Sequence, residues 1–472
     1  MTTTSAAVDL YDPDTYLAGP PHAAFAALRQ AAPVHWQPVP AGPAAPGYWA
    51  VLGYAEVDAV LCDPVLFSSE RAGVVLDDLP PDRLAQMRDM LLAMDPPRHR
   101  DYRRPLAHRF THRAIALLED RIRAVSRSIM AEAAERGRAG EPVEFVGQVA
   151  GQLPTRVVGE LMGLPREDWD YVHRLSEANN RGQDDSYAAA GGDGGQAGKL
   201  PPTVEMALYA AEFAARRRAA APAADDRAAA PAAGERAAAP GTDGPAAPAV
   251  DDAAAPGADD TAAADGVAVT PGEAGAAPFD DDLTSLLLTS DFGGRRMSNL
   301  DYGSFFVQLV TAGNDTTQTM LSSGLRALLT HPDQLAALRA DPALIPGAVE
   351  EILRWANPLH YFRRTATADA VVGGVQIRAG DRLATYFTAA NRDESVFDDP
   401  DRFDIRRSPN RHLSFGKGEH FCLGAHLARL EGKIFFEELL AAFSRIELAD
   451  TPVRVRSNLN NGLKSLPIRL AA

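Results

Sequence analysis

Residues 221–278 form a long segment in the middle of the chain that offers no material for a folded core. They are almost entirely Ala, Pro, Gly and Asp, with no aromatic residue and no apolar periodicity, a composition that is typical of disorder. The segment has ten acidic residues against two arginines, so it carries half of the formal net charge of −16. Any fold must therefore be built from the sequence on either side of it.

Helical patterns flank this segment, which favours an insertion within one domain. Apolar residues recur every three or four positions at 204–218 before it and at 281–289 after it. We therefore predict a single domain over residues 8–472, interrupted by a disordered insertion at 221–278 and preceded by a flexible N-terminus at 1–7. A linker between two independent domains is the alternative.

Most of the remaining sequence has a helical period. Further helices are predicted at 300–329, 333–339, 346–355 and 425–443. Strand-like stretches are fewer, and they lie at 47–52, 370–377, 382–388 and 453–469. The predicted fold class is mainly α, a large helical domain with small β-sheets.

Composition and charge exclude several classes of protein. With 46% hydrophobic and 23% charged residues, the chain has enough apolar material for a large core. We find neither a run of about 18 apolar residues nor a signal-peptide pattern, and the two cysteines lie in unrelated contexts. We therefore expect a cytoplasmic protein with no membrane span and no disulfide framework. The acidic balance argues against a partner that is a nucleic acid.

Three glycines surround one of the two cysteines directly before a predicted helix. The run is Phe415-Gly416-Lys417-Gly418-Glu419-His420-Phe421-Cys422-Leu423-Gly424. Glycines permit a tight loop close to a flat ligand. A cysteine at a helix start faces the positive end of the helix dipole and free backbone N–H groups, which favour thiolate over thiol. Cys422 is thus predicted to be a metal ligand, whereas Cys62 has no such neighbours and is predicted to be an ordinary buried thiol.

A polar break lies in the middle of the apolar helix predicted at 300–329. Its central residues read Ala312-Gly313-Asn314-Asp315-Thr316-Thr317. Because a buried, unpaired carboxylate is costly, Asp315 must be satisfied or used. Gly313 removes a side chain where a ligand could approach, and Asp315 and Thr316 place an acid and an alcohol beside that gap. In the structural alternative, Thr316 bonds back to a carbonyl and Asp315 caps a neighbour.

These motifs resemble those of the cytochrome P450 superfamily. The cysteine loop matches its haem-binding signature, Phe-x-x-Gly-x-(His/Arg)-x-Cys-x-Gly, at every fixed position, and the polar break matches its Ala/Gly-Gly-x-Asp/Glu-Thr motif. The resemblance implies the cytochrome P450 fold, haem b as cofactor and a monooxygenase that uses O2. It also implies that Cys422 is the axial iron ligand, that Phe415, Gly416 and Gly424 shape the haem site, and that Asp315 and Thr316 are catalytic.

The resemblance further assigns residues that hold the haem or support the cysteine loop. The two haem propionates need cationic partners, and the matching residues are His99, Arg103, Arg364, His412 and His420. The Glu-x-x-Arg helix of the family forms a buried structural network, for which the matching residues are Glu351, Arg354 and Arg402.

A separate redox partner is implied as well. In soluble family members the electrons come from NAD(P)H through a ferredoxin reductase and a ferredoxin, and an acidic ferredoxin would dock on a basic surface. The candidate basic residues are Arg104, Arg109, Arg113, Lys417 and Arg429, which could equally form an ordinary solvated face. We expect a monomer.

The motifs indicate the type of reaction more firmly than they indicate the substrate. Residues 312–317 and 390–394 are similar to actinobacterial members that hydroxylate sterol side chains or methyl-branched lipids, which favours a small apolar sterol, terpenoid or lipid. Tailoring of a polyketide or peptide natural product is the alternative. The predicted pocket residues are 74–79, Leu309, Ala312, Thr316, Leu359, His360, Tyr361 and Asn461.

Two other functions compete with the monooxygenase. A peroxide-driven enzyme typically lacks an acid–alcohol pair, so Asp315 and Thr316 disfavour it. A haem-free partner protein with the same fold usually loses the cysteine or its surrounding motif, and both are intact here.

Overall fold

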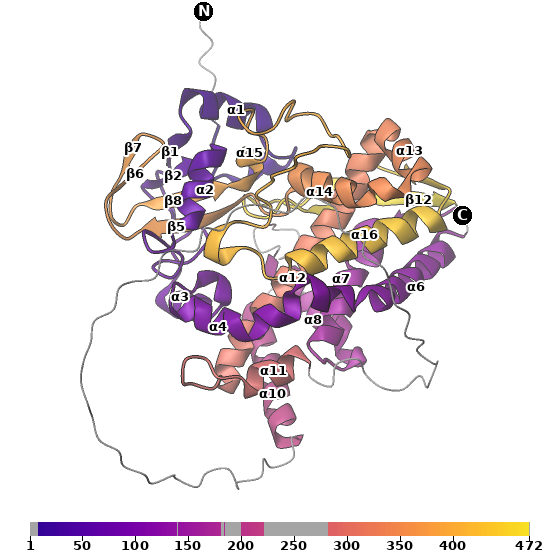
Figure 1. The fold of residues 1–472 in the computed structure, drawn as a ribbon, viewed down its shortest axis with the longest axis horizontal. Coiled ribbons are helices and arrows are strands. Elements are labelled where there is room, and N and C mark those ends of the chain that lie inside the picture. The colour runs from indigo at the N-terminus through magenta and orange to yellow at the C-terminus, as the bar shows by residue number, and fades with distance from the viewer. Residues whose placement is uncertain (1–7, 139, 181–183, 185–199, 221–281, 472) are drawn as a thin grey trace, which may run out of the picture. The chain divides into compact units, whose positions relative to one another are not determined.

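The structure, a computed structural model, describes residues 8–138, 140–180, 184, 200–220 and 282–471 (Figure 1). The predicted insertion at 221–278 and the predicted flexible N-terminus at 1–7 lie outside these residues. The described residues up to 218 and from 282 onward form one compact unit, which contains the elements that build the site.

The longest helix, α12 (Asn299–Thr330), lies at the centre of the helical part. Ser298 caps its first turn, because the Ser298 hydroxyl accepts the N–H of Asp301 and the Asp301 carboxylate accepts the N–H of Ser298. Its 32 residues extend about 48 Å and bury apolar side chains such as Phe305 and Leu321. Helices α7 (Gln152–Leu161), α8 (Trp169–Asn180), α14 (Ile345–Ala356) and α16 (Ala425–Ala442) pack around it.

The remaining helices are all shorter than α12. They are α1 (His22–Ala31), α2 (Tyr54–Cys62), α3 (Pro81–Arg88), α4 (Arg98–Ala107), α5 (His112–Ala116), α6 (Glu119–Gly137), α10 (Pro202–Ala220), α11 (Leu283–Thr289), α13 (Pro332–Ala340) and α15 (Phe387–Ala390). All six predicted helices are confirmed within a few residues, as α10 to α14 and α16. The helices before residue 181 were not predicted. In α4, for example, four arginines and a proline interrupt the apolar period, and only His99, Tyr102 and Leu106 are buried.

The main sheet lies beside the helical part and has the strand order β1-β2-β8-β5-β3. Strands β2 and β8 are parallel, and the other neighbours are antiparallel. The strands are β1 (Val34–Pro38), β2 (Gly47–Val51), β3 (Phe67–Ser68), β5 (Tyr361–Ala366) and β8 (Arg382–Tyr386). This sheet places β5 beside the cysteine loop, where its side chains reach the site.

Three small sheets complete the β structure. Strand β12 (Pro467–Ala471) pairs with β4 (Val143–Glu144) and β9 (Arg445–Leu448), β10 (Val453–Arg454) pairs with β11 (Leu463–Ser465), and β6 (Ala370–Val372) pairs with β7 (Val375–Ile377). The strand predicted at 370–377 is thus a hairpin, because Gly373 and Gly374 turn the chain with φ values of 55° and 78°. The predicted class, mainly α with small sheets, is confirmed.

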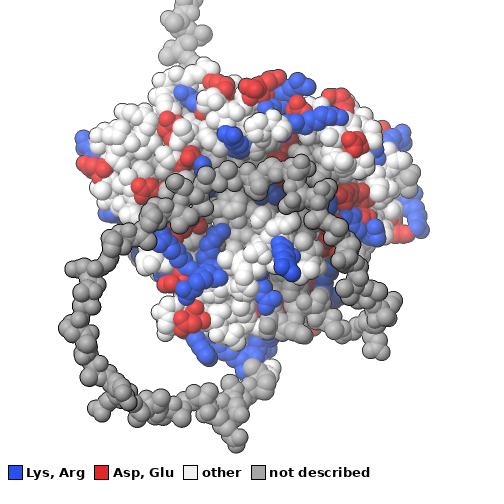
Figure 2. Space-filling view, viewed as in Figure 1, with Lys and Arg blue, Asp and Glu red and all other residues white. Residues whose placement is uncertain are grey.

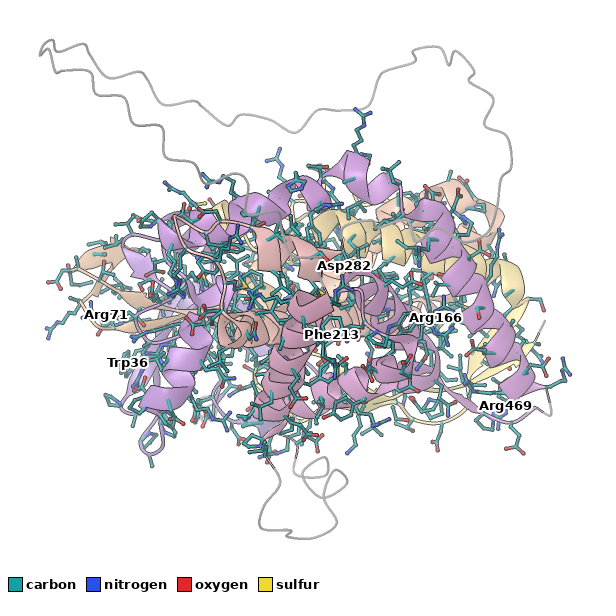
Figure 3. The ribbon with its side chains drawn as sticks, turned by 90° about the horizontal axis from the view of Figure 1, so that it is seen from below. Trp36, Arg71, Arg166, Phe213, Asp282 and Arg469 are labelled. Atoms are coloured by element: carbon teal, nitrogen blue, oxygen red, sulfur yellow. The ribbon has the colours of Figure 1, made fainter. Side chains whose placement is uncertain are left out.

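The described residues on either side of 221–281 contact one another. Arg217 near the end of α10 donates to the Asp282 carboxylate and to Ser285 Oγ, the latter at 2.7 Å. Asp282 also caps α11, since it accepts the N–H of Ser285 at 2.7 Å. Figure 3 labels Phe213 of α10 and Asp282 near the centre of the view, and Arg217 contacts both of them. The chain therefore leaves and re-enters the compact unit at neighbouring points.

Two further findings concern membrane-spanning helices and Cys62. None of the described helices combines the length and the apolar content that crossing a membrane requires. Cys62 is exposed at the end of α2, so the prediction of a buried core thiol was wrong.

Candidate functional site

A cavity of about 270 Å³ lies between the middle of α12 and the cysteine loop. Side chains of α4, β5 and the loop 414–424 form one part of its wall, side chains of α7, α11 and α12 form another, and residues of α2, α14, α15, α16 and the segments 91–92 and 358–359 also line it. The cavity thus brings the cysteine loop, the polar break and most of the predicted cationic residues together. Its further wall is apolar and consists of Leu91, Leu92, Val158, Leu161, Met162, Leu283 and Leu309.

The cysteine loop is a tight turn that points Cys422 toward this cavity. The N–H of Cys422 donates to the Phe415 carbonyl at 2.8 Å, and α16 begins three residues later. Gly416 has a φ of 67°, a conformation that other residues rarely adopt. A Cβ atom on Gly424 would meet no atom within 4 Å, so the wall is open there. Phe415, Gly416, Cys422 and Gly424 all line the cavity.

The protein surroundings of Cys422 shift its pKa in opposite directions, and the net shift is upward. Burial raises the pKa of Cys422, although the N–H of Gly424 and the charges of Arg103 and Arg429 lower it. The helix start and its N–H groups therefore stabilise the thiolate less than the sequence predicts, because burial outweighs them. A cation at the sulfur would supply the missing stabilisation.

Two arginines and two histidines line the cavity on the side of α4 and β5. Arg364 is fully buried, donates to the Arg363 carbonyl at 2.9 Å, and has its pKa lowered to about 10 by burial. Burial also lowers the pKa of Arg103. The rings of His99 and His420 lie 4.4 Å apart. Among the described residues, His99 Nδ1 and His420 Nε2 have no hydrogen-bond partner although both atoms are buried.

The two histidines each have a buried ring nitrogen without a hydrogen-bond partner among the described residues, and the two arginines beside them are cationic. Burial, and then Arg103, lower the pKa of His99 to about 4, and burial, Arg364 and His99 lower the pKa of His420 to about 2. Buried donors without partners cost on the order of 1–3 kcal/mol each. A ligand with carboxylate groups would accept from the two guanidinium groups and the two rings, so the wall is suited to a dianion.

His412 lies elsewhere, and the structure does not support its predicted contact with the ligand. Its Nε2 lies 3.2 Å from Glu350 Oε2, and its Nδ1 accepts the N–H of Ser414 at 3.2 Å. Arg429 holds the same carboxylate through bonds of 2.7 and 2.9 Å. Burial would raise the pKa of Glu350, but His412 and Arg429 lower it to about 2. His412 thus faces a carboxylate of the protein itself.

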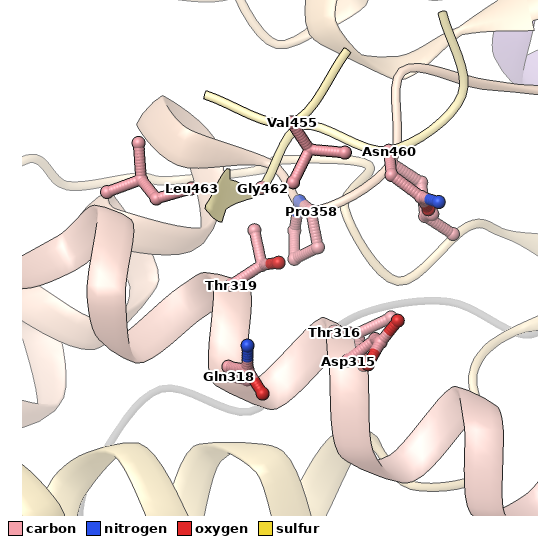
Figure 4. Close-up of a pocket in the computed structure, with 10 residues that line it drawn as sticks. Asp315, Thr316, Gln318, Thr319, Pro358, Val455, Asn460, Gly462 and Leu463 are labelled. Atoms are coloured by element: carbon pink, nitrogen blue, oxygen red, sulfur yellow. The ribbon is translucent and has the colours of Figure 1, made fainter. Parts of the chain in front are cut away.

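The polar break of α12 borders two spaces. Thr316 lines the large cavity, and its hydroxyl donates to the Ala312 carbonyl at 2.6 Å, as the structural alternative expected. Asp315 lines a neighbouring pocket of about 20 Å³, which Thr316 also borders (Figure 4). A pocket of this size holds about one water molecule. At Gly313, a Cβ atom would lie 2.8 Å from the Val158 side chain, so glycine also allows close packing of α7.

Only part of the predicted substrate pocket lines the cavity. Leu309, Ala312, Thr316 and Leu359 do so, whereas His360, Tyr361, Asn461 and residues 74–79 do not line it. Side chains alternate along β5, so Phe362 and Arg364 face the cavity and Tyr361 faces away. Tyr361 instead accepts the N–H of Leu76 at 3.4 Å, and the His360 ring packs on Tyr16 at 4.3 Å.

The other residues outside the cavity lining make contacts within the fold. The side-chain amide of Asn461 donates to the carbonyls of Ala356 and Asn357 at 3.1 Å. The Val74 and Leu76 carbonyls accept from Arg363. Gln308 was missed as a lining residue, although it precedes Ala312 by one turn on the same face of α12.

The Glu-x-x-Arg network is present but its third member differs from the prediction. Arg354 donates to Glu351 through two bonds of 2.7 and 2.8 Å, and both side chains are fully buried. Arg407, rather than Arg402, supplies the second guanidinium, with Nε 3.2 Å from Glu351 Oε2. Arg402 contributes only its carbonyl, which accepts from Arg354 at 3.1 Å. The side chain of Arg402 is exposed, whereas that of the next residue, Phe403, is buried.

Comparison with known proteins agrees with this arrangement. The family model "Cytochrome P450" matches residues 279–470. Cytochrome P450 126 of Mycobacterium tuberculosis is 36% identical over 98% of this chain and 97% of its own length. A steroid C26-monooxygenase of Mycolicibacterium smegmatis is 31% identical over 93% of this chain and 88% of its own length.

A solved structure has the same fold. Cytochrome P450 CYP268A2 of Mycobacterium marinum, in complex with pseudoionone, superposes with a TM-score of 0.76 and 33% identity, covering 95% of this chain and 94% of that chain. Identity above 30% along almost the whole of two relatives carries the same conclusion as the motifs. The chain belongs to the cytochrome P450 family of monooxygenases.

Proposed function

We propose that the cavity holds haem b, with Cys422 as the sulfur ligand to its iron. The observation that carries this proposal is the convergence, in one cavity, of an open cysteine loop with two arginines and with two histidines, each of which has a buried ring nitrogen without a hydrogen-bond partner among the described residues. Arg103, Arg364, His99 and His420 would bind the two propionates, and Phe415, Gly416 and Gly424 would border the macrocycle. The iron charge would stabilise the Cys422 thiolate that burial disfavours.

We propose that the protein's own residues on the opposite side manage protons. Bound haem would supply the activation of O2 and the insertion of one oxygen atom into a C–H bond. The Thr316 hydroxyl donates its hydrogen to the Ala312 carbonyl. Its oxygen can therefore still accept a hydrogen bond from the cavity side. Asp315 would pass protons to that side through the water-sized pocket that both residues border.

The proposed substrate is a small apolar molecule such as a sterol, terpenoid or lipid, which would be hydroxylated. The leucine-rich wall of the cavity supports this class, because burial of apolar surface is the main source of affinity there. The relative named for steroid oxidation and the solved structure with pseudoionone bound point to the same class.

The proposed electron route is NAD(P)H, a ferredoxin reductase and a ferredoxin. Figure 2 shows Lys and Arg side chains gathered over α3 and α4. Two of the predicted docking cations are neutralised, since Lys417 pairs with Asp58 and Arg429 pairs with Glu350. Arg104 and Arg113 are exposed and remain the candidates for contact with an acidic partner.

Two spectra test the haem assignment. Reduced wild-type protein treated with carbon monoxide is expected to give the Soret band of thiolate-ligated haem, and Cys422→Ser is expected to lose it. Cys62→Ser is the matched control, because Cys62 is the other cysteine and lies outside the cavity lining. An unchanged band in Cys422→Ser, or the band of an imidazole-ligated haem in wild type, would refute the assignment.

A further inference from the structure

One polar side chain stands on the apolar part of the cavity wall. Gln308, Ala312 and Thr316 follow one another at four-residue spacing on α12, and all three line the cavity. Gln308 lies about 12 Å from Thr316 along the helix axis. Leu91, Leu92, Leu283 and Leu309 line the same cavity, and Leu92 is the residue that Gln308 contacts. The amide therefore lies on a wall with many apolar side chains, two turns of α12 from Thr316.

The orientation of this amide follows from its one recorded bond. The backbone N–H of Leu92 donates to Gln308 Oε1 at 3.4 Å. A backbone N–H can only donate, so the amide oxygen must face Leu92 and the NH2 group must point elsewhere. Among the described residues no acceptor is recorded for this NH2 group. The cavity wall thus presents a hydrogen-bond donor that is tethered but unused.

We propose that Gln308 is a specificity-determining residue that donates to one carbonyl or hydroxyl oxygen of the substrate. The inference rests on the proposed function and names its substrate class more closely. The substrate would be an apolar ring system or branched chain with a single oxygen, held about 12 Å along α12 from Thr316. The carbon to be oxidised would lie at the opposite end, near Thr316.

Charge favours a neutral oxygen over a carboxylate. The Gln308 amide is uncharged, and the cationic side chains of the cavity, Arg103 and Arg364, lie on the side of α4 and β5. A carboxylate against this leucine-rich wall would lose its hydration without gaining a counterion, which is costly. A ketone or alcohol loses less and gains the amide hydrogen bond.

The competing role is structural, in which Gln308 merely ties residue 92 to α12. The bond of 3.4 Å is long for an N–H···O hydrogen bond, so this tether is weak. Two substitutions separate the roles. Gln308→Leu removes both the tether and the donor, whereas Gln308→Glu keeps an acceptor for the Leu92 N–H and removes the NH2 donor.

The test is a binding titration of the haem-loaded protein, followed by the spin-state shift of its ferric Soret band. The probes are two matched pairs, pseudoionone with its deoxygenated triene and cholest-4-en-3-one with cholest-4-ene. The measured quantity is the ratio of ketone affinity to hydrocarbon affinity, because it cancels general changes in the cavity. Gln376→Leu, at an exposed glutamine of β7, is the control variant.

The proposal predicts that for at least one pair this ratio falls about threefold to tenfold in both Gln308→Leu and Gln308→Glu, and stays constant in the control. An unchanged ratio in Gln308→Leu would overturn it. A ratio lost in Gln308→Leu but kept in Gln308→Glu would assign the tether instead. If neither ketone shifts the spectrum of wild-type protein that gives the thiolate band, the substrate class is wrong while the proposed function stands.

Discussion

At the scale of single residues, Thr316 is the side chain whose removal best tests the proposed proton supply. It borders both the large cavity and the water-sized pocket of Asp315. We expect Thr316→Ala to bind substrate as wild type does. The amount of product formed per NAD(P)H consumed should fall about tenfold, and hydrogen peroxide should be released instead. The measurement is the ratio of peroxide and product to NAD(P)H oxidised. Thr316→Ser, which keeps the hydroxyl, is the control, and tight coupling in Thr316→Ala would contradict the assignment.

Glu431 of α16 is a buried carboxyl group that the sequence does not single out. It is 2% exposed, and the Thr317 hydroxyl donates to its Oε2 at 3.5 Å. Burial raises the pKa of Glu431 to about 8, although the Thr317 bond lowers it. The folded protein therefore keeps this proton at neutral pH, while the unfolded chain releases it near pH 4.5. Unfolding between these two values releases a proton, so the stability of the protein falls as the pH rises.

Glu431→Gln removes this titration. We expect the variant to gain stability relative to wild type by up to about 1.4 kcal/mol per pH unit between pH 5 and pH 8, and no further above pH 8. Urea midpoints at several pH values measure this gain. Glu438→Gln on the same helix is the control: Arg127 and Arg123 lower the pKa of Glu438 against the effect of burial, so the carboxyl is ionised in both states between pH 5 and pH 8 and the stability difference should not change with pH there. A gain independent of pH would show that Glu431 is ionised in the folded protein.

At the scale of elements, the network behind the cysteine loop depends on α14 and on the segment after residue 400. Glu351 is fully buried and is bound by Arg354, Arg407 and Asn410. We expect Arg407→Ala to cost about 2 kcal/mol or more, since it leaves part of a buried carboxylate unpaired. Arg402→Ala should cost less than about 0.5 kcal/mol, because only its backbone carbonyl takes part. Equal losses in the two variants, measured as urea midpoints, would contradict the observed partner choice.

The helices, strand β5 and the Glu351 network differ in how well the sequence predicts them. Long apolar periods predicted α12 and α16 almost to the residue, because their buried faces repeat over several turns. Short helices such as α4 were missed because contacts from distant segments, rather than their own apolar period, hold them. Glu351 binds Arg407 rather than Arg402 because of chain reversals that the local sequence pattern does not encode. Phe362 rather than Tyr361 faces the cavity because of the register of β5, which the local pattern does not encode either.

At the scale of the whole molecule, the flanks of residues 221–278 lie at neighbouring points of one compact unit. Arg217 bonds to Asp282 and Ser285, and Arg218 donates to the Met297 carbonyl at 2.5 Å. A short linker can therefore join the two flanks without moving α10 or α11. If the segment is the disordered insertion that its composition predicts, the closing of a long loop disfavours folding, and each halving of its length recovers about 0.6 kcal/mol.

We expect replacement of residues 221–278 by six Gly and Ser residues to raise the free energy of unfolding by about 2 kcal/mol. The carbon monoxide spectrum and the substrate-induced spin shift should remain those of wild type. The same replacement combined with Arg217→Ala should lose part of the gain, because the flanks are then less firmly joined. Loss of the thiolate spectrum in the shortened chain would contradict the insertion and favour two domains that depend on each other. A stability below wild type with an intact spectrum would instead show that the segment itself contributes folded contacts.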